Sequence, residues 1–152
     1  IGYARDHAPV LELDALATPD AGALAAGALD WAAGRLGDAP VVIAASAPPE
    51  QVVALQARLG REAAGALVEQ AMATIAEGLV ARGVGRLVVA GGETSGAVVQ
   101  RLGVTSLRIG PEIDPGVPWT YAEPAGLHLA LKSGNFGARD FFLKAFDVAV
   151  HP

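Results

Sequence analysis

The sequence has no cysteine and a low density of charge. The absence of cysteine excludes disulfides and thiolate metal sites. A formal net charge of −5 leaves no basic footprint, which argues against a nucleic-acid partner. Uninterrupted apolar runs stay short of the roughly 20 residues that a membrane span needs, and Ile1–Asp6 does not resemble a signal peptide. We therefore expect a cytoplasmic protein that binds neither nucleic acid nor membrane.

The sequence contains enough apolar residues for a folded domain. Of the 152 residues, 52% are hydrophobic and 18% are charged, a balance that is not typical of disordered chains. This length is normal for one domain and allows a sizeable core to be buried. The sequence therefore predicts a single folded domain.

Strand-like and helix-like segments alternate along the chain. Short apolar runs predict strands at Val10–Leu13, Val41–Ala45, Arg86–Ala90, Ser106–Ile109 and Leu127–Leu131. Helices are expected from a capping Thr18, from Pro48, over Arg61–Arg82, over Ala97–Leu102, and from Asn135 to about Val148. Pro111–Pro118 is expected to be a loop with fixed turns. Such alternation predicts a three-layer α/β sandwich with a mostly parallel sheet, mixed at one edge.

Two glycine-rich segments, Gly91–Gly96 and Lys132–Gly137, each follow a predicted strand and precede a predicted helix. Glycine lets a backbone approach a ligand closely, and a helix that begins there directs unpaired N–H groups at that ligand. Phosphates suit such a place. The pattern favours a nucleotide site, although each segment could also be only a tight turn between a strand and a helix.

Three of the candidate residues follow predicted strands directly. Ser46, Gly91 and Lys132 each stand at a strand's carboxyl end. Ligands of open α/β sheets bind beyond these ends, so the three are expected to share one site. Neither segment has the P-loop pattern or the G-x-G-x-x-G fingerprint, which counts against an NAD-dependent oxidoreductase.

Several polar residues of the two segments have two interpretations each. Glu93 either reaches Mg²⁺, directly or through water, or only interacts with the dipole of the following helix. Lys132 either pairs with a phosphate or is an exposed lysine at the end of a strand. Thr94 and Ser95 add hydroxyl donors where a phosphate would lie, and Asn135 is expected to cap the last helix.

Other chemical groups give weaker signals. Asp114 and Asp140 are candidate metal or catalytic carboxylates, but a turn acid and a surface helix acid are the favoured interpretations. His7, His128 and His151 lack metal-ligand spacing, and no Ser-His-Asp arrangement is recognisable. We therefore assign no catalytic residue and no set of metal ligands.

Three segments in order, "VVAGGETSGAVVQRLGV", "IGPEIDPGVPW" and "LALKSGNFGARDFFLKA", resemble the C-terminal nucleotide-binding domain of the four-carbon acid sugar kinases. That family includes threonate, erythronate and oxo-tetronate kinases. The resemblance implies an ATP- and Mg²⁺-dependent kinase in which this chain, residues 1–152, binds the nucleotide. A substrate-binding N-terminal domain would be missing here, so the isolated chain is expected to be inactive.

The resemblance also implies which residues contact the nucleotide, because the family's glycine loops and its serine-containing segment match "IAASAPPEQVVALQ" and the segments above. The residues carried over are Ser46, Gly91, Gly92, Glu93, Thr94, Ser95, Gly96, Lys132 and Gly134. The alternative is a stand-alone module that senses a nucleotide or a phosphorylated metabolite without catalysis. Self-association into a homo-oligomer stays open.

Overall fold

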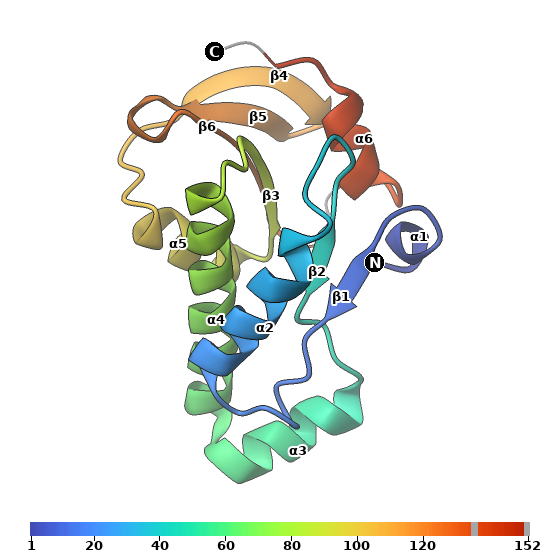
Figure 1. Cartoon of the computed structure of the whole chain (residues 1–152), viewed down its shortest axis with the longest axis vertical. Coiled ribbons are helices and arrows are strands. Elements are labelled where there is room, and N and C mark those ends of the chain that lie inside the picture. The colour runs from blue at the N-terminus through green and yellow to red at the C-terminus, as the bar shows by residue number, and fades with distance from the viewer. Residues whose placement is uncertain (135–136, 151–152) are drawn as a thin grey trace.

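The computed structural model describes residues 1–134 and 137–150, in which six strands form two sheets (Figure 1). The strands are β1 (Val10–Glu12), β2 (Val42–Ala44), β3 (Arg86–Ala90), β4 (Arg108–Asp114), β5 (Val117–Ala122) and β6 (Leu127–Lys132). β1 and β2 form a parallel pair, and the larger sheet has the order β3-β6-β5-β4. Its β3–β6 ladder is parallel, while β6–β5 and β5–β4 are antiparallel. The predicted α/β class, with a mixed edge, is confirmed.

Helices connect and cover the strands. They are α1 (Gly2–Arg5), α2 (Ala21–Ala33), α3 (Pro49–Leu59), α4 (Arg61–Ala81), α5 (Gly92–Arg101), α6 (Phe141–Asp147) and the 3₁₀ turn η1 (Glu123–Ala125). The long predicted helix is confirmed to within one residue. Within residues 1–134 and 137–150, none of these helices has the length and apolar character needed to cross a membrane.

The start of α2 differs from the prediction. Asp20, not Thr18, is the capping residue, and its Oδ1 accepts a hydrogen bond of 2.7 Å from the N–H of Ala23. Pro19 therefore precedes the cap instead of occupying the first helical position. A carboxylate oxygen at this position satisfies one of the unpaired N–H groups of the first turn.

The larger sheet has helices on both faces. On one face, Leu127 and Leu129 of β6 are fully buried and lie in a cluster with Val80 of α4 and with Leu102, the residue directly after α5. On the other face, Ala130 packs in a cluster with residues of α6. Alternate side chains of a strand point to opposite faces, so a single strand supplies both clusters.

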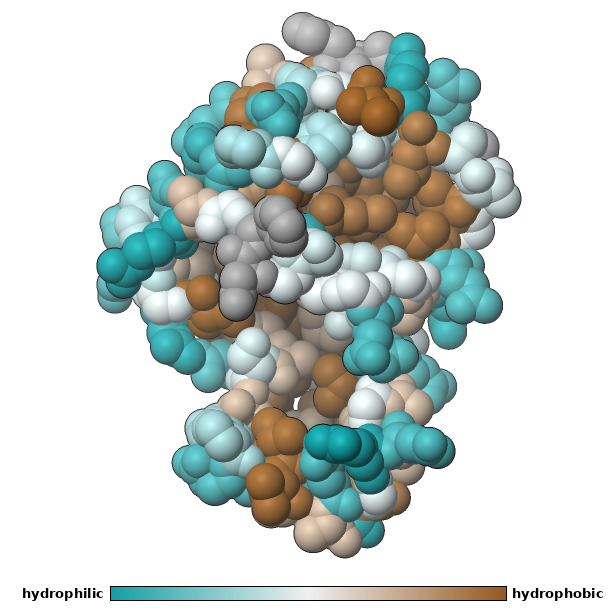
Figure 2. Space-filling model, turned by 180° about the vertical axis from the view of Figure 1, so that it is seen from behind, coloured by the Kyte–Doolittle hydropathy of each residue, from teal (hydrophilic) through white to brown (hydrophobic). Residues whose placement is uncertain are grey.

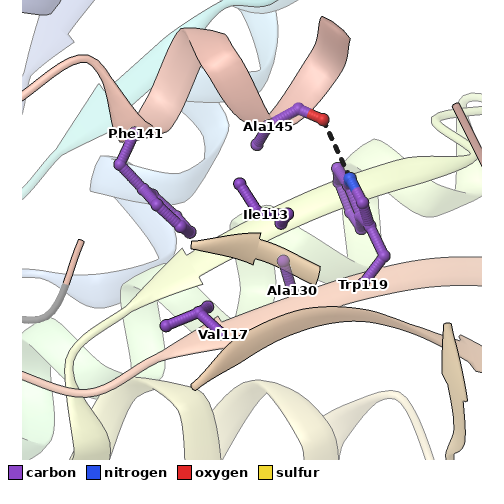
Figure 3. Packing of buried hydrophobic residues seen from close by; sticks show 6 residues of the cluster. All are labelled: Ile113, Val117, Trp119, Ala130, Phe141 and Ala145. Carbon is purple, nitrogen blue, oxygen red and sulfur yellow. Dashed lines mark hydrogen bonds between the residues drawn. The ribbon is translucent and has the colours of Figure 1, made fainter. Parts of the chain in front are cut away.

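The α6 face has the largest buried side chain of the protein at its centre (Figure 3). Trp119 of β5 is completely buried, and its Nε1 donates a hydrogen bond of 2.8 Å to the carbonyl of Ala145. Phe141 of α6 closes the same cluster over Ile113 and Val117. The buried indole N–H is thus satisfied, and the contact fixes α6 against the sheet.

The segment expected to be a loop, Pro111–Pro118, is instead part of a β-hairpin. β4 runs from Arg108 to Asp114 and pairs with β5 through a ladder with register shifts between Ile109 and Asp114. β4 is the edge strand, where a missing proline N–H costs no ladder bond. The turn-forming residues concealed the strand because such residues are tolerated at sheet edges.

Strands β1, β2 and β3 all run downward in Figure 1, and β1 and β2 are parallel partners. Their carboxyl ends therefore lie toward one side of the molecule, above the lobe that contains α3 (Figure 1). Seen from behind, the surface carries patches of hydrophobic residues and is hollowed above the lowest lobe (Figure 2).

Candidate functional site

The carboxyl ends of β2, β3 and β6 open onto one cavity of about 1010 Å³. Ser46, Ala90, Thr94, Lys132 and Gly134 all line it. Four of these were selected from the sequence, and they come from three separate parts of the chain. The structure therefore brings the two glycine segments and the serine segment together, as the strand pattern predicts.

The two glycine segments are tied together by their backbones. The N–H of Gly91 donates a hydrogen bond of 2.8 Å to the carbonyl of Lys132. Gly91 has φ of +107°, a conformation that side chains with a Cβ rarely adopt. Glycine is therefore required at this point by the turn itself.

Helix α5 begins at Gly92, directly after this turn, and not at Ala97 as expected. Most of the first glycine segment is thus helix, and its remaining glycines occupy helical positions. The consequence is chemical. The unpaired N–H groups of the first turn, and the positive end of the helix dipole, lie immediately beside the end of β3.

The hydroxyl-bearing residues of α5 differ in their surroundings. Thr94 lines the cavity, whereas the Oγ of Ser95 is buried and has no hydrogen-bond partner among the described atoms. Gly92, Glu93 and Gly96 are exposed. Thr94 is therefore the hydroxyl-bearing side chain of this helix that has access to a ligand in the cavity.

Lys132 is not the exposed end-of-strand lysine that one interpretation proposed. It is only 9% exposed, and its Nζ donates a hydrogen bond of 2.8 Å to the carbonyl of Gly134. The same Nζ lies 5.8 Å from the centre of the Phe141 ring. Within residues 1–134 and 137–150 no carboxylate forms an ion pair with this lysine, so the ammonium can still pair with an anion in the cavity.

The second segment forms a loop of different shape from the first. Gly134 has φ of +49° and is exposed. The predicted cap Asn135 and its neighbour Phe136 lie outside the described residues. Helix α6 begins only at Phe141, where Asp140 precedes it without a side-chain capping bond.

Asp114 lies behind this loop, directly before the hairpin turn at 115–116, and it is a buried structural anchor. Its Oδ1 pairs with the Nζ of Lys144, and its Oδ2 accepts a hydrogen bond of 2.8 Å from the N–H of Ala138. The hydrogen bond from Lys144, with that from Ala138, holds the pKa of Asp114 below its ordinary value. The carboxylate therefore joins the end of β4 to the loop before α6.

Sequence reasoning did not find the burial of Lys132 or the role of Asp114. The burial of Lys132 did have a signal in the sequence. Lys132 and Ala130 are two residues apart in β6, so their side chains point to the same face of the sheet, the face that α6 covers. Asp114 had no such signal, because its partners follow it by 24 and 30 residues.

A metal ion would have few protein ligands here. Among residues 1–134 and 137–150, no three histidine, aspartate or glutamate side chains gather closely enough to hold one. Glu93, exposed in the first turn of α5, is the carboxylate among the selected site residues. This is compatible with Mg²⁺, which commonly keeps several waters and binds one or two carboxylates together with phosphates.

The family model of the nucleotide-binding C-terminal domain matches residues 1–142. The chain belongs to this family. Curated relatives named 3-oxo-tetronate kinase are 58% identical over 142 residues in Methylobacterium radiotolerans and 58% identical over 138 residues in Cupriavidus necator. These alignments cover 92% and 90% of this chain but 34% and 32% of the relatives. The chain thus spans about a third of the length of the curated relatives that it matches.

Solved structures share the fold of this chain. A Salmonella typhimurium protein superimposes with a TM-score of 0.85 at 39% identity, over 95% of this chain and 36% of that one. A Haemophilus influenzae protein gives 0.85 at 37% identity, over 95% of this chain and 35% of that one. A Bordetella bronchiseptica structure, a domain-swapped dimer with bound citrate, shares the fold with a TM-score of 0.68 at 22% identity. The match covers 95% of this chain and 35% of that one.

Proposed function

We propose that this chain binds ATP and presents its γ-phosphate within a kinase that phosphorylates a four-carbon sugar acid of the 3-oxo-tetronate type. The observation that carries the proposal is the meeting of two anion-binding features in one cavity. The first turn of α5 supplies backbone N–H groups, and Lys132 supplies a buried ammonium group. The names of the curated relatives support the choice of acceptor.

These positions give each group a separate proposed role in binding the phosphates. N–H groups of the first turn of α5 hold phosphate oxygens, and Thr94 adds a hydroxyl donor from the same helix. Lys132 approaches from the opposite segment and offsets the charge that the phosphates carry. Catalysis of phosphoryl transfer is mostly positioning and charge stabilisation, which fixed donors of this kind provide.

Glu93 and the nucleotide's own phosphates would hold Mg²⁺, which would supply positive charge to offset that of the phosphates. The exposed position of Glu93 in the first turn allows its carboxylate to reach such an ion directly or through water. Within this proposal the carboxylate also interacts favourably with the helix dipole, so its position is stable with or without the ion.

The acceptor pocket and the base that activates the hydroxyl would lie in the remaining part of the full-length protein. In-line transfer requires the acceptor hydroxyl to be aligned with the γ-phosphate, and most of the rate comes from holding both together. We therefore expect no acceptor-dependent turnover from the 152 residues alone. The Bordetella neighbour is a domain-swapped dimer, which is a reason to test the full-length protein for self-association by sedimentation.

A coupled ADP-release assay tests the proposed reaction. The full-length protein should show turnover that depends on 3-oxo-tetronate, threonate or erythronate, and the 152-residue chain should show none above its slow hydrolysis of ATP. Binding of ATP without turnover by the full-length protein, across the whole panel, would favour a sensing module. Acceptor-dependent turnover by the short chain would mean that the substrate pocket has been misplaced.

A further inference from the structure

The cavity extends well beyond the carboxyl ends of the strands. Residues 41–45 line it along the full length of β2, and residues 85–90 line it along the full length of β3. No ladder joins these two strands in the described part of the chain; each is the last strand of its own sheet. A nucleotide at the carboxyl ends would fill one end of this groove and leave the rest empty.

The edge of β2 that faces the groove carries backbone groups outside its ladder. The N–H of Val42 donates to the carbonyl of Pro9, and the carbonyl of Ala44 accepts from the N–H of Leu13. In a parallel ladder, alternate residues direct both backbone groups to the same neighbouring strand. Val42 and Ala44 therefore face β1, and Ile43 directs its N–H and C=O away from β1.

The facing edge of β3 has the same property. The carbonyl of Gly85 accepts from the N–H of His128, and the N–H of Gly91 donates to the carbonyl of Lys132. These odd-numbered positions face β6, so Val88 and the other even-numbered positions direct their backbone groups to the opposite edge. Two rows of backbone donors and acceptors thus border the groove.

The walls of the groove are apolar. Met72, Ile75 and Leu79 of α4 line it, and Phe142 and Phe146 of α6 line it as well. Helices on both faces of a parallel strand are the usual surroundings of a central strand, whose sequence is a continuous apolar run. The lining therefore matches the two faces of a buried strand as well as its two edges.

We propose that the groove receives one extended, apolar strand of the full-length polypeptide, parallel to β2 and β3, which joins the two sheets into one. The curated relatives are about three times as long as this chain, so they have the polypeptide to supply it. The choice of occupant rests on the proposed function, in which this chain is part of a longer kinase. The existence of the groove does not depend on that function. The carboxyl end of such a strand would arrive between Ser46 and Ala90, beside the proposed nucleotide.

Amide hydrogen exchange, measured without nucleotide, tests the proposal. The full-length protein should exchange the Ile43 and Val88 amides about a hundredfold more slowly than the 152-residue chain does. The amides of Val42 and His128, which are bonded within the existing ladders, are the internal controls and should change by less than about threefold.

Three other exchange patterns overturn the proposal. Equal exchange in both proteins would show that no strand enters the groove. Protection of the short chain that rises with its concentration would assign the groove to a second copy. In a parallel measurement with ATP added, protection that appears only with ATP would assign the whole groove to the nucleotide. Failure of the full-length protein to bind ATP would refute the proposed function and leave this result unchanged.

Thiol labelling gives an independent measurement, because the chain has no cysteine of its own. Met72→Cys places a thiol on the wall of the groove, and Val53→Cys places one on α3, where Val53 is 65% exposed. In a full-length background without other thiols, Met72→Cys should label at least about tenfold more slowly than in the short chain, and Val53→Cys should label equally in both. Equal labelling of Met72→Cys in both proteins would contradict the proposal.

Discussion

Two strand-to-helix junctions meet in the candidate site, and they differ in what they offer a ligand. At the first, a single residue, Gly91, separates β3 from a ten-residue helix. At the second, eight residues separate β6 from α6, and the chemical group at its start is the buried ammonium of Lys132. One junction therefore presents backbone amides, and the other presents a cation.

The difference shows that similar glycine-rich sequences can have different physical purposes. In the first junction glycine permits the turn that places a helix N-terminus directly at the sheet edge. In the second, the loop provides the Gly134 carbonyl that holds the lysine side chain. An anion between them would be held from two sides by groups of different kinds. Changes that affect one junction only should separate the two contributions.

The largest effect is expected at Gly91. With φ of +107°, Gly91→Ala should lower the free energy of unfolding by about 1–3 kcal/mol and abolish detectable ATP binding, because the start of α5 must shift. Gly134, at φ of +49°, lies in a region that other residues can enter, so Gly134→Ala should cost only about 1–2 kcal/mol. Denaturant melts and calorimetric titration measure both quantities.

Gly92→Ala is the matched control for Gly91→Ala. A Cβ at Gly92 meets no atom within 4 Å, and its φ is not in the left-handed region. Its stability should equal or exceed that of the wild type, since alanine favours helix over glycine. Equal stability of the Gly91 and Gly92 variants would show that the turn does not depend on glycine.

The next effect is expected at Lys132. Lys132→Met keeps the length of the side chain but removes the charge, and should weaken ATP binding by about ten- to a hundredfold, the usual range for one hydrogen bond to a charged group. Arg139→Met removes an exposed cation of the same loop and should leave the affinity unchanged. Unchanged affinity in Lys132→Met would assign anion binding to the helix N-terminus alone.

A smaller effect, on stability, is expected at the anchor of the second loop. The pKa of Asp114 is lowered in the folded protein by its hydrogen bond from Lys144 and then by that from Ala138. Its contribution is therefore present above the unfolded pKa of 3.8 and is lost as pH falls below that value. Asp114→Asn should lower the melting temperature at pH 7. Between pH 5 and pH 2 the melting temperature of this variant should fall less than that of the wild type.

Asp38→Asn, in an exposed loop, is the control for this pH dependence. It should follow the wild-type melting curve over the whole pH range. If Asp114→Asn also does so, the ion pair between Asp114 and Lys144 makes no net contribution to stability. Binding of ATP measured beside the melts would show whether the anchor also supports the shape of the second loop.

The smallest effect is expected at Glu93. Glu93→Gln should reduce the gain in ATP affinity that Mg²⁺ gives, by a few-fold, and leave affinity without Mg²⁺ nearly unchanged, since the carboxylate acts through the ion. Titrations with Mg²⁺ and with a chelator measure this difference. An equal change under both conditions would assign Glu93 to the helix dipole only.

The sequence was informative where local pattern decides the structure. The strand Arg86–Ala90 was predicted with its observed bounds because an apolar run there is flanked by glycines. The helix at Gly92 was missed because three glycines within the segment 91–96 suggest a loop, whereas the strand before it and the packing of α5 against α4 favour a helix. The hairpin was missed for a similar reason, since its edge position tolerates Pro111.

Most features that depend on distant pairing could not be predicted from the sequence. The convergence of Ser46, Gly91 and Lys132 is an exception, because the carboxyl ends of parallel strands lie at one edge of a sheet. The groove between β2 and β3 did not, because nothing in two apolar runs indicates whether they are neighbours. The contacts of Asp114 likewise depend on the hairpin and α6 coming together.

The most direct measurement of the central claim is the melting temperature of the 152-residue chain, titrated with ATP–Mg²⁺ and separately with NAD. A ligand that binds only the folded state stabilises it by RT ln(1 + [L]/Kd), about 2.7 kcal/mol at a hundredfold excess over Kd. We predict a rise that grows with ATP concentration, is lost in Gly91→Ala and Lys132→Met, and is much smaller with NAD. A folded sample whose melting temperature does not change at millimolar ATP would contradict the nucleotide site described above.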